Sequence, residues 1–382
     1  MKLNGSPSNI TVCTAAAFSL AAVVFSWAQR RRGQRLHRFC CRMPKTDLHA
    51  HLSGSIRPST LLKLSEERGL SFKARQLLDA VCNTRDSRTL SQCFEIFELI
   101  HKTIDSIAVL RRVTREVIDD MAASSVVYLE LRTTPRALPD GTTKRAYVLA
   151  VAGEILKHPK GGSVRLILSL DRALSAKDND ETVALAIELA STSAVVVGLD
   201  VSGNPTKGSF AELVAQLTLA RSAGLPITVH CGEVENGAEL DQILAFKPQR
   251  LGHALWLEKR HIGHLLSLQN PPPVELCPTS NVKTLRLTDF DTHPTARLWL
   301  DEKYPICINT DDTGVFFTNA GEEYHLFAKA MNLDSAEIAE ISMNSIGISF
   351  LRDDAKRAGI VAEMKSRVEF LLWLDFLSFG VI

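Results

Sequence analysis

Disulfide chemistry and an excess charge of one sign are both lacking in this chain of 382 residues. Its 8 Cys are too few for a disulfide framework at this length, and no two of them have the Cys-x-x-Cys spacing of a zinc pair. The formal net charge of +1 gives no reason to expect nucleic acid or a strongly acidic partner. With 45% apolar and 23% charged residues, the composition is that of a cytoplasmic protein with a sizeable core and reduced thiols.

Acidic side chains are absent from the start of the chain, since no Asp or Glu occurs before Asp47. An apolar stretch, residues 10–28, is followed by six Arg within residues 30–42. Such a segment is typical of a signal anchor or an organelle transit peptide. It is short and rich in small residues for a membrane span, which needs about 20 strongly apolar residues.

A third reading of this segment is a mis-assigned start, because Met43 directly precedes the first predicted strand. We therefore separate residues 1–42 as a leader and expect a single domain over residues 43–382. If the leader is a genuine targeting segment, the protein belongs in an organelle or on a membrane instead of free in the cytoplasm.

Eight apolar runs follow the leader, each succeeded by a helical pattern. They begin near residues 45, 126, 164, 195, 226, 250, 273 and 305, and the seventh extends to Asn281. Strands that are apolar on both faces are typical of a parallel sheet, so eight such units predict an α/β fold, a (β/α)8 TIM barrel. A doubly wound open sheet is the competing architecture.

The connection between the first two runs is too long for one crossover helix. Helical periodicity in it predicts extra helices at residues 58–67, 90–103 and 107–124. We expect these helices to form a lid over the mouth of the barrel.

Two histidines lie two residues apart at the end of the first run, in Asp47-Leu48-His49-Ala50-His51. Side chains two apart on a strand point the same way, so His49 and His51 face one side and can bind one metal ion. Alone this is weak evidence, because the pattern is short and common.

Polar residues also occur at the ends of the other runs, and in a barrel these ends meet at one face and build the active site. They are Arg136 with Thr133 and Thr134, Asp171, Gly203, His230 with Glu233, His253, Asn281, and Asp311 with Asp312. Packing does not easily explain four histidines and three acidic residues at strand ends one, five, six and eight. Their convergence predicts a metal site.

Imidazoles with one carboxylate suit zinc, or another borderline divalent ion, better than calcium or magnesium. We expect one zinc ion per chain, held by His49, His51, His230 and Asp311. Such an ion lowers the pKa of a bound water toward about 7 and so provides hydroxide at neutral pH. We expect His253 to orient the hydroxide or take its proton, and Glu233 to act as a general acid if its surroundings raise its pKa.

At this point five motifs, spread in order over roughly residues 43–350, resemble those of the adenosine/AMP deaminase family of zinc amidohydrolase barrels. They are Thr46-Asp47-Leu48-His49-Ala50-His51-Leu52, Val229-His230-Cys231-Gly232-Glu233, Arg250-Leu251-Gly252-His253-Ala254, Pro278-Thr279-Ser280-Asn281 and Asn309-Thr310-Asp311-Asp312. The resemblance implies that hydroxide attacks C6 of adenine while Glu233 protonates N1. It also implies that Asp312 and the backbone of Gly203 hold the purine edge.

Within that family the run from Leu129 to Arg136 is most similar to the adenosine deaminase-like branch, whose members release methylamine from N6-methyl-AMP to give IMP. The resemblance then implies substrate contacts from His51, Ser53, His101, Thr133, Thr134, Pro135, Arg136 and Asp171. Hydroxyls and a guanidinium at one strand end also suit a 5′-phosphate. Ser53 departs from the branch, which more often has Asn there.

Other functions remain open at this stage. Deamination of free adenosine is the nearest alternative, a metal-dependent phosphoesterase barrel is a more distant one, and a catalytically silent nucleotide-binding barrel is a third. The other zinc deaminase fold is excluded because its Pro-Cys-x-x-Cys signature is absent. We expect a monomer that takes a small purine nucleotide and whose core has no nucleic-acid or membrane partner.

Overall fold

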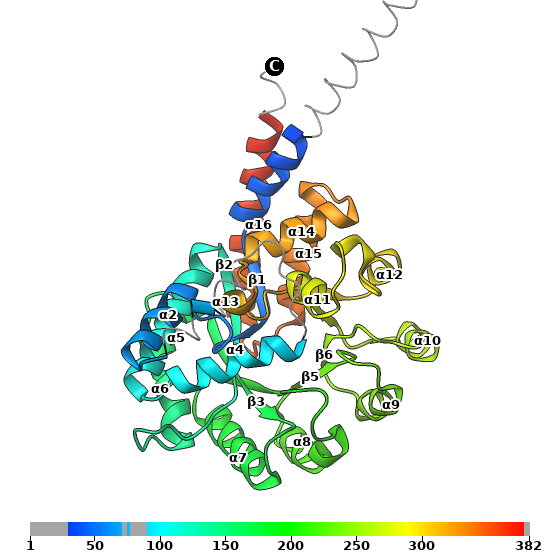
Figure 1. The fold of residues 1–382 in the computed structure, drawn as a ribbon. Coiled ribbons are helices and arrows are strands. Elements are labelled where there is room, and N and C mark those ends of the chain that lie inside the picture. Colours follow the sequence, from blue (N-terminus) through cyan, green and yellow to red (C-terminus); the bar gives the residue numbers. More distant parts are fainter. Residues whose placement is uncertain (1–29, 71–74, 77–89, 378–382) are drawn as a thin grey trace, which may run out of the picture.

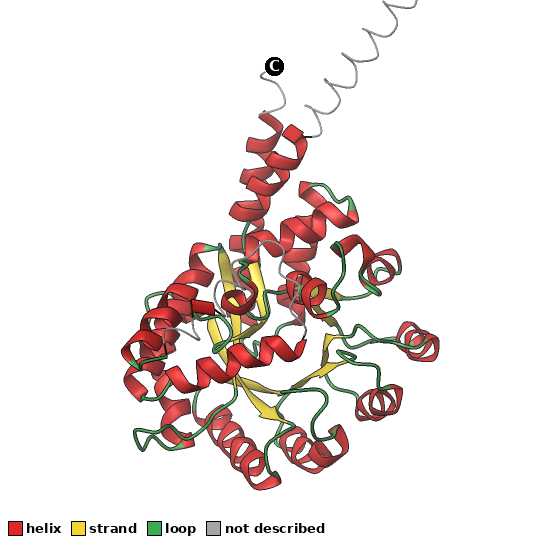
Figure 2. Cartoon of the chain, in the orientation of Figure 1, coloured by secondary structure: helices red, strands yellow, loops and turns green. Residues whose placement is uncertain are grey.

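The computed structural model describes residues 30–70, 75–76 and 90–377. Eight parallel strands form one sheet in the order β1-β2-β3-β4-β5-β6-β7-β8. They are β1 (Lys45–His51), β2 (Val126–Thr133), β3 (Val164–Asp171), β4 (Val196–Ser202), β5 (Ile227–Cys231), β6 (Arg250–His253), β7 (Val274–Leu276) and β8 (Ile306–Ile308). In Figure 2 the strands lie inside a surrounding layer of helices, so the predicted α/β barrel is confirmed.

The first and last strands meet at one place. Ala50 and Asp311 form an isolated parallel bridge, in which His51 N donates to Asp311 O at 2.8 Å and Asp311 N donates to His49 O at 2.8 Å. The barrel therefore closes beside two of the histidines and the aspartate singled out above.

Helices follow most strands and form the outer layer. They are α6 (Lys144–Lys157), α7 (Ala176–Thr192), α8 (Val214–Ser222), α9 (Gly237–Phe246), α10 (Lys259–Ser267), α11 (Pro278–Thr284), α12 (Ala296–Asp301), α13 (Thr313–Phe316), α14 (Ala320–Met331), α15 (Ser335–Ile348) and α16 (Asp354–Leu377), with 3-10 turns at Gly161–Ser163, Phe210–Leu213 and Phe290–Thr292. The seventh run is shorter than predicted, because Pro278 is the first residue of α11, a position that suits its fixed φ.

The described part of the connection between β1 and β2 includes three further helices, as its length predicted: α2 (Pro58–Glu67), α4 (Leu90–Thr103) and α5 (Ile107–Ala123). Helix α4 lies across the opening of the barrel in Figure 1. Its Cys93, Ile96, Leu99 and Ile100 are buried, which is the face that the helical spacing of apolar residues provides.

The interior of the barrel carries charge as well as apolar side chains. Charged side chains with no more than 1% exposed surface include Glu130, Arg132, Asp200, Arg250 and Glu275. Arg250 forms an ion pair with Glu130 at 2.6 Å, and Arg132 forms one with Asp200 at 3.1 Å. Buried charges are costly without such partners, so these pairs form a fixed framework beneath the strand ends.

Part of the segment that sequence analysis separated as a leader is ordered against the barrel. Residues 30–42 are helical and lie beside α16 in Figure 1. Phe39 and Cys40 are buried there, and Lys45 Nζ donates to the carbonyls of Cys40 and Met43 at 2.6 and 2.7 Å. Within the described ranges, no helix combines the length and apolarity needed to cross a bilayer.

Candidate functional site

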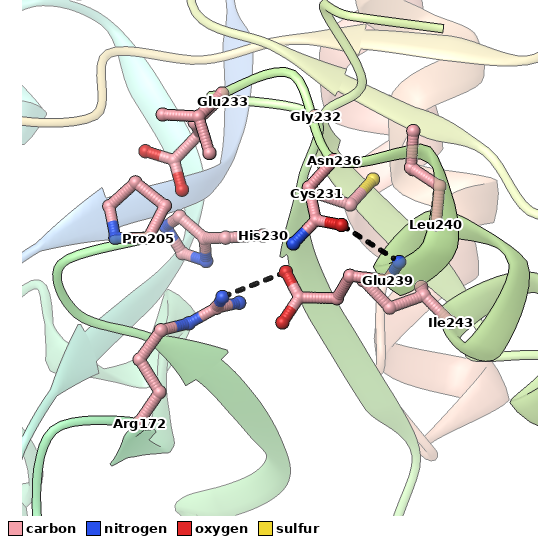
Figure 3. Close-up of a pocket in the computed structure, with 11 residues that line it drawn as sticks. Arg172, Pro205, His230, Cys231, Gly232, Glu233, Asn236, Glu239, Leu240 and Ile243 are labelled. Atoms are coloured by element: carbon pink, nitrogen blue, oxygen red, sulfur yellow. Dashed lines mark hydrogen bonds and ion pairs between the residues drawn. The ribbon is translucent and has the colours of Figure 1, made fainter. Parts of the chain in front are cut away.

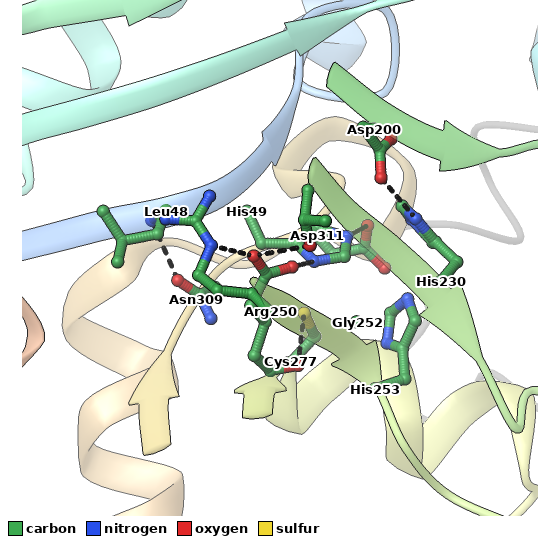
Figure 4. Close-up of polar contacts among 12 residues, drawn as sticks. Leu48, His49, Asp200, His230, Arg250, Gly252, His253, Cys277, Asn309 and Asp311 are labelled. Atoms are coloured by element: carbon green, nitrogen blue, oxygen red, sulfur yellow. Dashed lines mark hydrogen bonds and ion pairs between the residues drawn. The ribbon is translucent and has the colours of Figure 1, made fainter. Parts of the chain in front are cut away.

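Four potential metal-ligand atoms, from His49, His51, His230 and Asp311, converge at the ends of β1 and β5 and just after β8. Figure 4 shows three of these residues, His49, His230 and Asp311. Nε2 of His51 lies 3.3 Å from Nε2 of His49 and 3.2 Å from Nε2 of His230. Oδ1 of Asp311 lies 3.4 Å from Nε2 of His49 and 3.5 Å from Nε2 of His51. The sequence predicted that these four residues meet at the strand ends, and in the structure they lie side by side.

Buried carboxylates fix how two of these imidazoles are protonated. Nδ1 of His49 donates to Glu275 at 2.7 Å, and Nδ1 of His230 donates to Asp200 at 3.0 Å. Burial alone would raise the pKa of Glu275, but Arg132, Arg250 and the hydrogen bond from His49 together outweigh it and hold this pKa well below its usual range. An ionised carboxylate only accepts, so each ring carries its hydrogen on Nδ1 and turns the lone pair of Nε2 into the cluster.

The cluster has the dimensions of a zinc site. Ligands at about 2.0–2.1 Å in a tetrahedral arrangement lie about 3.4 Å apart, and four of the six separations among these atoms are 3.2–3.5 Å. Two lone pairs and the Asp311 carboxylate facing one another at low exposure would repel unless a cation satisfied them. Burial also lowers the pKa of His51 to about 3, which keeps that ring in the neutral, metal-binding form.

A fourth histidine, His253 at the end of β6, lies against the same cluster. Ligand atoms of His49, His230, His253 and Asp311 all lie within 4.8 Å of one another. Asn281 Nδ2 donates to Nδ1 of His253 at 3.0 Å, while Asn281 Oδ1 accepts from Cys277 N and from His293 Nε2. His253 therefore carries its hydrogen on Nε2 and offers the cluster a donor, which makes His51 the better metal ligand.

Backbone strain accompanies this geometry. His253, Ala254 and Asp311 have φ values of 60°, 51° and 61°, a region that residues with a Cβ seldom occupy. Strain of this kind persists only where surrounding contacts impose it, and it is common at functional sites. Here it turns His253 and Asp311 toward the cluster.

Glu233 lies on the turn after β5, and Figure 3 shows it beside His230 and Pro205 in a pocket. Its carboxyl group is surrounded by protein although the residue is partly exposed, and this burial raises its pKa. The nearby Arg172 donates to Glu239 at 2.9 Å, so its charge is already compensated by another carboxylate. A raised pKa favours the protonated form that a general acid needs, so Glu233 stays the predicted general acid.

Asp312 has a buried carboxylate oxygen, Oδ1, with no hydrogen-bond partner among the described residues. Burial, followed by the neighbouring Asp311 carboxylate, raises its pKa well above the usual range. A Cβ on Gly54 would lie 1.6 Å from that oxygen, so only glycine leaves the space that Asp312 occupies. A buried polar atom without a partner at such a site is a candidate contact for a ligand.

Asp171 and Gly203 are also brought together, at the ends of β3 and β4. Gly203 has a φ of 95°, and a Cβ there would lie 2.1 Å from Oδ1 of Asp171. Burial raises the pKa of Asp171, whose Oδ1 accepts from Ala173 N at 2.8 Å. Ser53 is partly exposed in the turn after β1.

The residues predicted to hold a phosphate divide into two environments. Thr133 is buried, and its hydroxyl pairs with the Tyr147 hydroxyl at 2.8 Å. Arg136 is partly exposed beneath the lid and donates through Nη2 to the carbonyls of His101 and Ile104, at 3.0 and 2.8 Å. Its Nε and Nη1 form no hydrogen bond with any described residue. Arg136 and the His101 backbone are therefore adjacent, with Thr134 and Pro135 in the same turn.

The carboxylates and arginines that support the histidines were not predicted from the sequence. They are Asp200, Glu275, Arg132 and Arg250. Each is a charged residue within a mostly apolar strand, as in Val274-Glu275-Leu276 and Leu199-Asp200-Val201. A charge inside a strand that is buried on both faces requires a partner within the barrel. A charge within an apolar strand could therefore have indicated these four residues.

The fold is a parallel (β/α)8 barrel with buried imidazoles and a carboxylate at its strand ends. A carboxylic acid of raised pKa, Glu233, lies beside them. These features define a hydrolase barrel of the amidohydrolase type with a metal site.

Comparisons with known proteins give the family. The adenosine deaminase family model matches residues 44–366. An N6-mAMP deaminase of Arabidopsis thaliana is 38% identical, with 82% of this chain and 94% of that protein covered. An N6-methyl-AMP deaminase of Homo sapiens is 36% identical, with 83% and 92% covered. The crystal structure of Arabidopsis ADAL complexed with IMP superimposes with a TM-score of 0.79 at 35% identity, covering 86% of this chain and 98% of that one. This chain belongs to the adenosine deaminase family.

Proposed function

We propose that the protein hydrolyses the C6–N6 bond of a purine nucleotide, with N6-methyl-AMP as the substrate and IMP and methylamine as the products. The observation that carries the deaminase chemistry is the convergence of the Nε2 atoms of His49, His51 and His230 on Asp311, beside Glu233. Similarity to N6-methyl-AMP deaminases over more than four-fifths of the chain supports the nucleotide as substrate.

In this proposal His49, His51, His230 and Asp311 hold one zinc ion, as their donor types and separations favour. When bound, zinc supplies Lewis acidity that brings the pKa of a coordinated water toward about 7. Glu275 and Asp200 orient two of the rings from behind, which preserves the lone pairs for the ion.

The remaining residues handle protons and orientation. Glu233, protonated because of its burial, donates to N1 of the purine as the C6 carbon is attacked. His253 donates from Nε2 to the attacking oxygen and so directs it at C6. Asp312, whose Oδ1 has no partner in the described part of the chain, and the backbone at Gly203 hold the other edge of the base. Over one turnover the attacking water supplies its oxygen to C6 and both of its hydrogens: one replaces the proton that Glu233 gave to N1, and the other leaves on methylamine.

The 5′-phosphate is proposed to lie at the barrel mouth, under α4. Arg136 is held there by two carbonyls of the lid, with Nε and Nη1 left for a ligand. Thr134 in the same turn adds a hydroxyl, and His101 lies on the lid helix that Arg136 contacts. Arg–phosphate contacts of this kind are charge-assisted and geometrically selective. A nucleoside would leave this cation without an anionic partner.

The experiment that tests the proposal is a steady-state assay of the purified chain with N6-methyl-AMP, AMP and adenosine, read by the purine absorbance change and by methylamine or ammonia release. We expect the highest kcat/KM on N6-methyl-AMP. A preference for adenosine would move the protein to nucleoside deamination. Inactivity on all three substrates with the metal site loaded would contradict the deaminase assignment.

A further inference from the structure

A second group of potential metal ligands lies outside the strand-end cluster, where the helical segment 30–42 packs on α14. His37 and Cys41 are four residues apart on that segment, and Glu322 and His325 are three residues apart on α14. Residues three or four apart on a helix share one face. Each helix therefore presents two potential ligands to the other.

Distances place three of these groups around a common point. Nε2 of His37 lies 2.7 Å from Oε1 of Glu322 and 3.7 Å from Sγ of Cys41. Their ligand atoms all lie within 4.8 Å of one another. Tetrahedral zinc with nitrogen at about 2.0–2.1 Å and sulfur at about 2.3 Å separates those two ligands by about 3.6 Å. The nitrogen–sulfur pair already has this spacing.

The carboxylate needs a small movement. A nitrogen and an oxygen ligand of tetrahedral zinc lie about 3.4 Å apart, so the His37–Glu322 ion pair would open as the ion enters. The Glu322 side chain is 47% exposed, which leaves it free to make this adjustment. The same exposure provides a path for an ion from solvent.

His325 lies beside His37 at the same joint. Its ring lies edge-on to that of His37, with centroids 4.8 Å apart. Its Nδ1 is buried and forms no hydrogen bond with a described residue. Burial, followed by the charge of His37, lowers the pKa of His325, so its ring is neutral and able to bind a metal.

The two helices approach closely enough for a shared ion. A Cβ on Gly321 would lie 3.0 Å from Cα and 3.1 Å from Sγ of Cys41, so glycine at this position admits the thiol to the joint. Thiolate, imidazole and carboxylate together suit zinc better than calcium or magnesium. We propose that His37, Cys41 and Glu322 form a second zinc site, with His325 beside them, that clamps the segment 30–42 onto α14.

The site is separable from the deaminase centre because it contains sulfur. None of His49, His51, His230 and Asp311 offers a thiolate, so a thiolate-to-cobalt charge-transfer band that is lost in Cys41→Ser reports on the joint. We would load the full 382-residue chain with zinc or with cobalt and measure metal per chain and the near-ultraviolet spectrum. The reading does not depend on deaminase activity.

The expected result is two zinc ions per wild-type chain and a thiolate-to-cobalt band. Cys41→Ser should lose the band and one zinc ion while keeping wild-type turnover. We also expect zinc to raise the temperature of thermal unfolding of the wild-type chain, and Cys41→Ser should lose the part of this stabilisation that the second zinc ion provides. The matched control is Cys40→Ala, which removes the adjacent buried thiol and should keep both the band and the second zinc. His37→Gln and Glu322→Gln, at partly exposed positions, provide two further variants should Cys41→Ser fail to fold.

Three outcomes would overturn the proposal. The first is a wild-type chain with no thiolate-to-cobalt band. The second is a band that survives Cys41→Ser but disappears in Cys40→Ala. The third is a zinc content that none of the His37, Cys41 and Glu322 variants changes, which would leave His37 and Glu322 as an ordinary ion pair.

Discussion

The two halves of the proposed active site are built differently. The barrel half, His49, His51, His230, His253 and Asp311, is supplied by strand ends and braced by buried carboxylates. The lid half, His101, Thr134 and Arg136, is partly or largely exposed and depends on α4 lying over the mouth. The barrel half is thus fixed before a substrate arrives, whereas the lid half is completed by a helix from an insertion.

This contrast indicates what each half controls. Preorganised donors in a site with little water contribute to the chemical step, because they need no rearrangement as charge develops. A contact at the mouth contributes mainly to which substrate is held. Changes in the barrel half should therefore affect all substrates equally, and changes in the lid half should separate nucleotide from nucleoside.

The largest effect is expected from His230→Ala, which removes one of the proposed ligands and leaves Asp200 without its imidazole partner. The variant should lose most of its catalytic zinc and its turnover on every substrate. Metal analysis beside the assay checks this. A variant that is free of metal yet still deaminates would contradict the proposed role of the barrel half.

Next comes Glu233→Gln, which keeps the shape of the side chain but removes the proton donor. We expect the protein to fold and retain zinc while kcat falls by at least about 100-fold, the contribution usual for a general acid. Nucleotide and nucleoside should lose the same factor. Near-normal turnover would mean that the proton comes from another group.

A smaller change is expected from Asp200→Asn, which weakens support for His230 without touching the ion. Loss of such a partner typically lowers metal affinity by about 10- to 100-fold. Competition with a chelator, monitored by residual activity, measures this. Full activity should return at saturating zinc, and failure to recover would show that Asp200 acts through the fold, since it also pairs with Arg132.

Arg136→Ala addresses the lid half. A charge-assisted contact with phosphate contributes roughly 1.5–3 kcal/mol, so kcat/KM for N6-methyl-AMP should fall by about 10- to 100-fold. Activity on adenosine should change little. Because Arg136 also donates to the carbonyls of His101 and Ile104, equal losses on both substrates would instead mean that it holds the lid in place.

Much of this division was visible in the sequence. The periodicity of the apolar residues predicted the barrel and the helices between its first two strands. The position of His49, His51, His230 and Asp311 at strand ends predicted that they meet, because parallel strands bring their ends together. The bracing by Glu275 and Asp200 was not predicted, since which inward charges pair depends on barrel register. The ordered segment 30–42 was also missed, because its arginine-rich composition resembles a targeting sequence and its contacts are with the distant α14 and α16.

The single bridge between Ala50 and Asp311 has a consequence for how the protein is made. Strand β1 emerges early from the ribosome and must wait for β8, so closing the ring is a late, long-range event with a large entropic cost. Nascent chains that end before β8 should be unable to retain zinc. In the folded protein a metal ion bound by His49 and His51 on one strand and by Asp311 after the other would hold the two ends of the barrel together. Removing the metal should therefore selectively accelerate hydrogen exchange at the His51 and Asp311 amides.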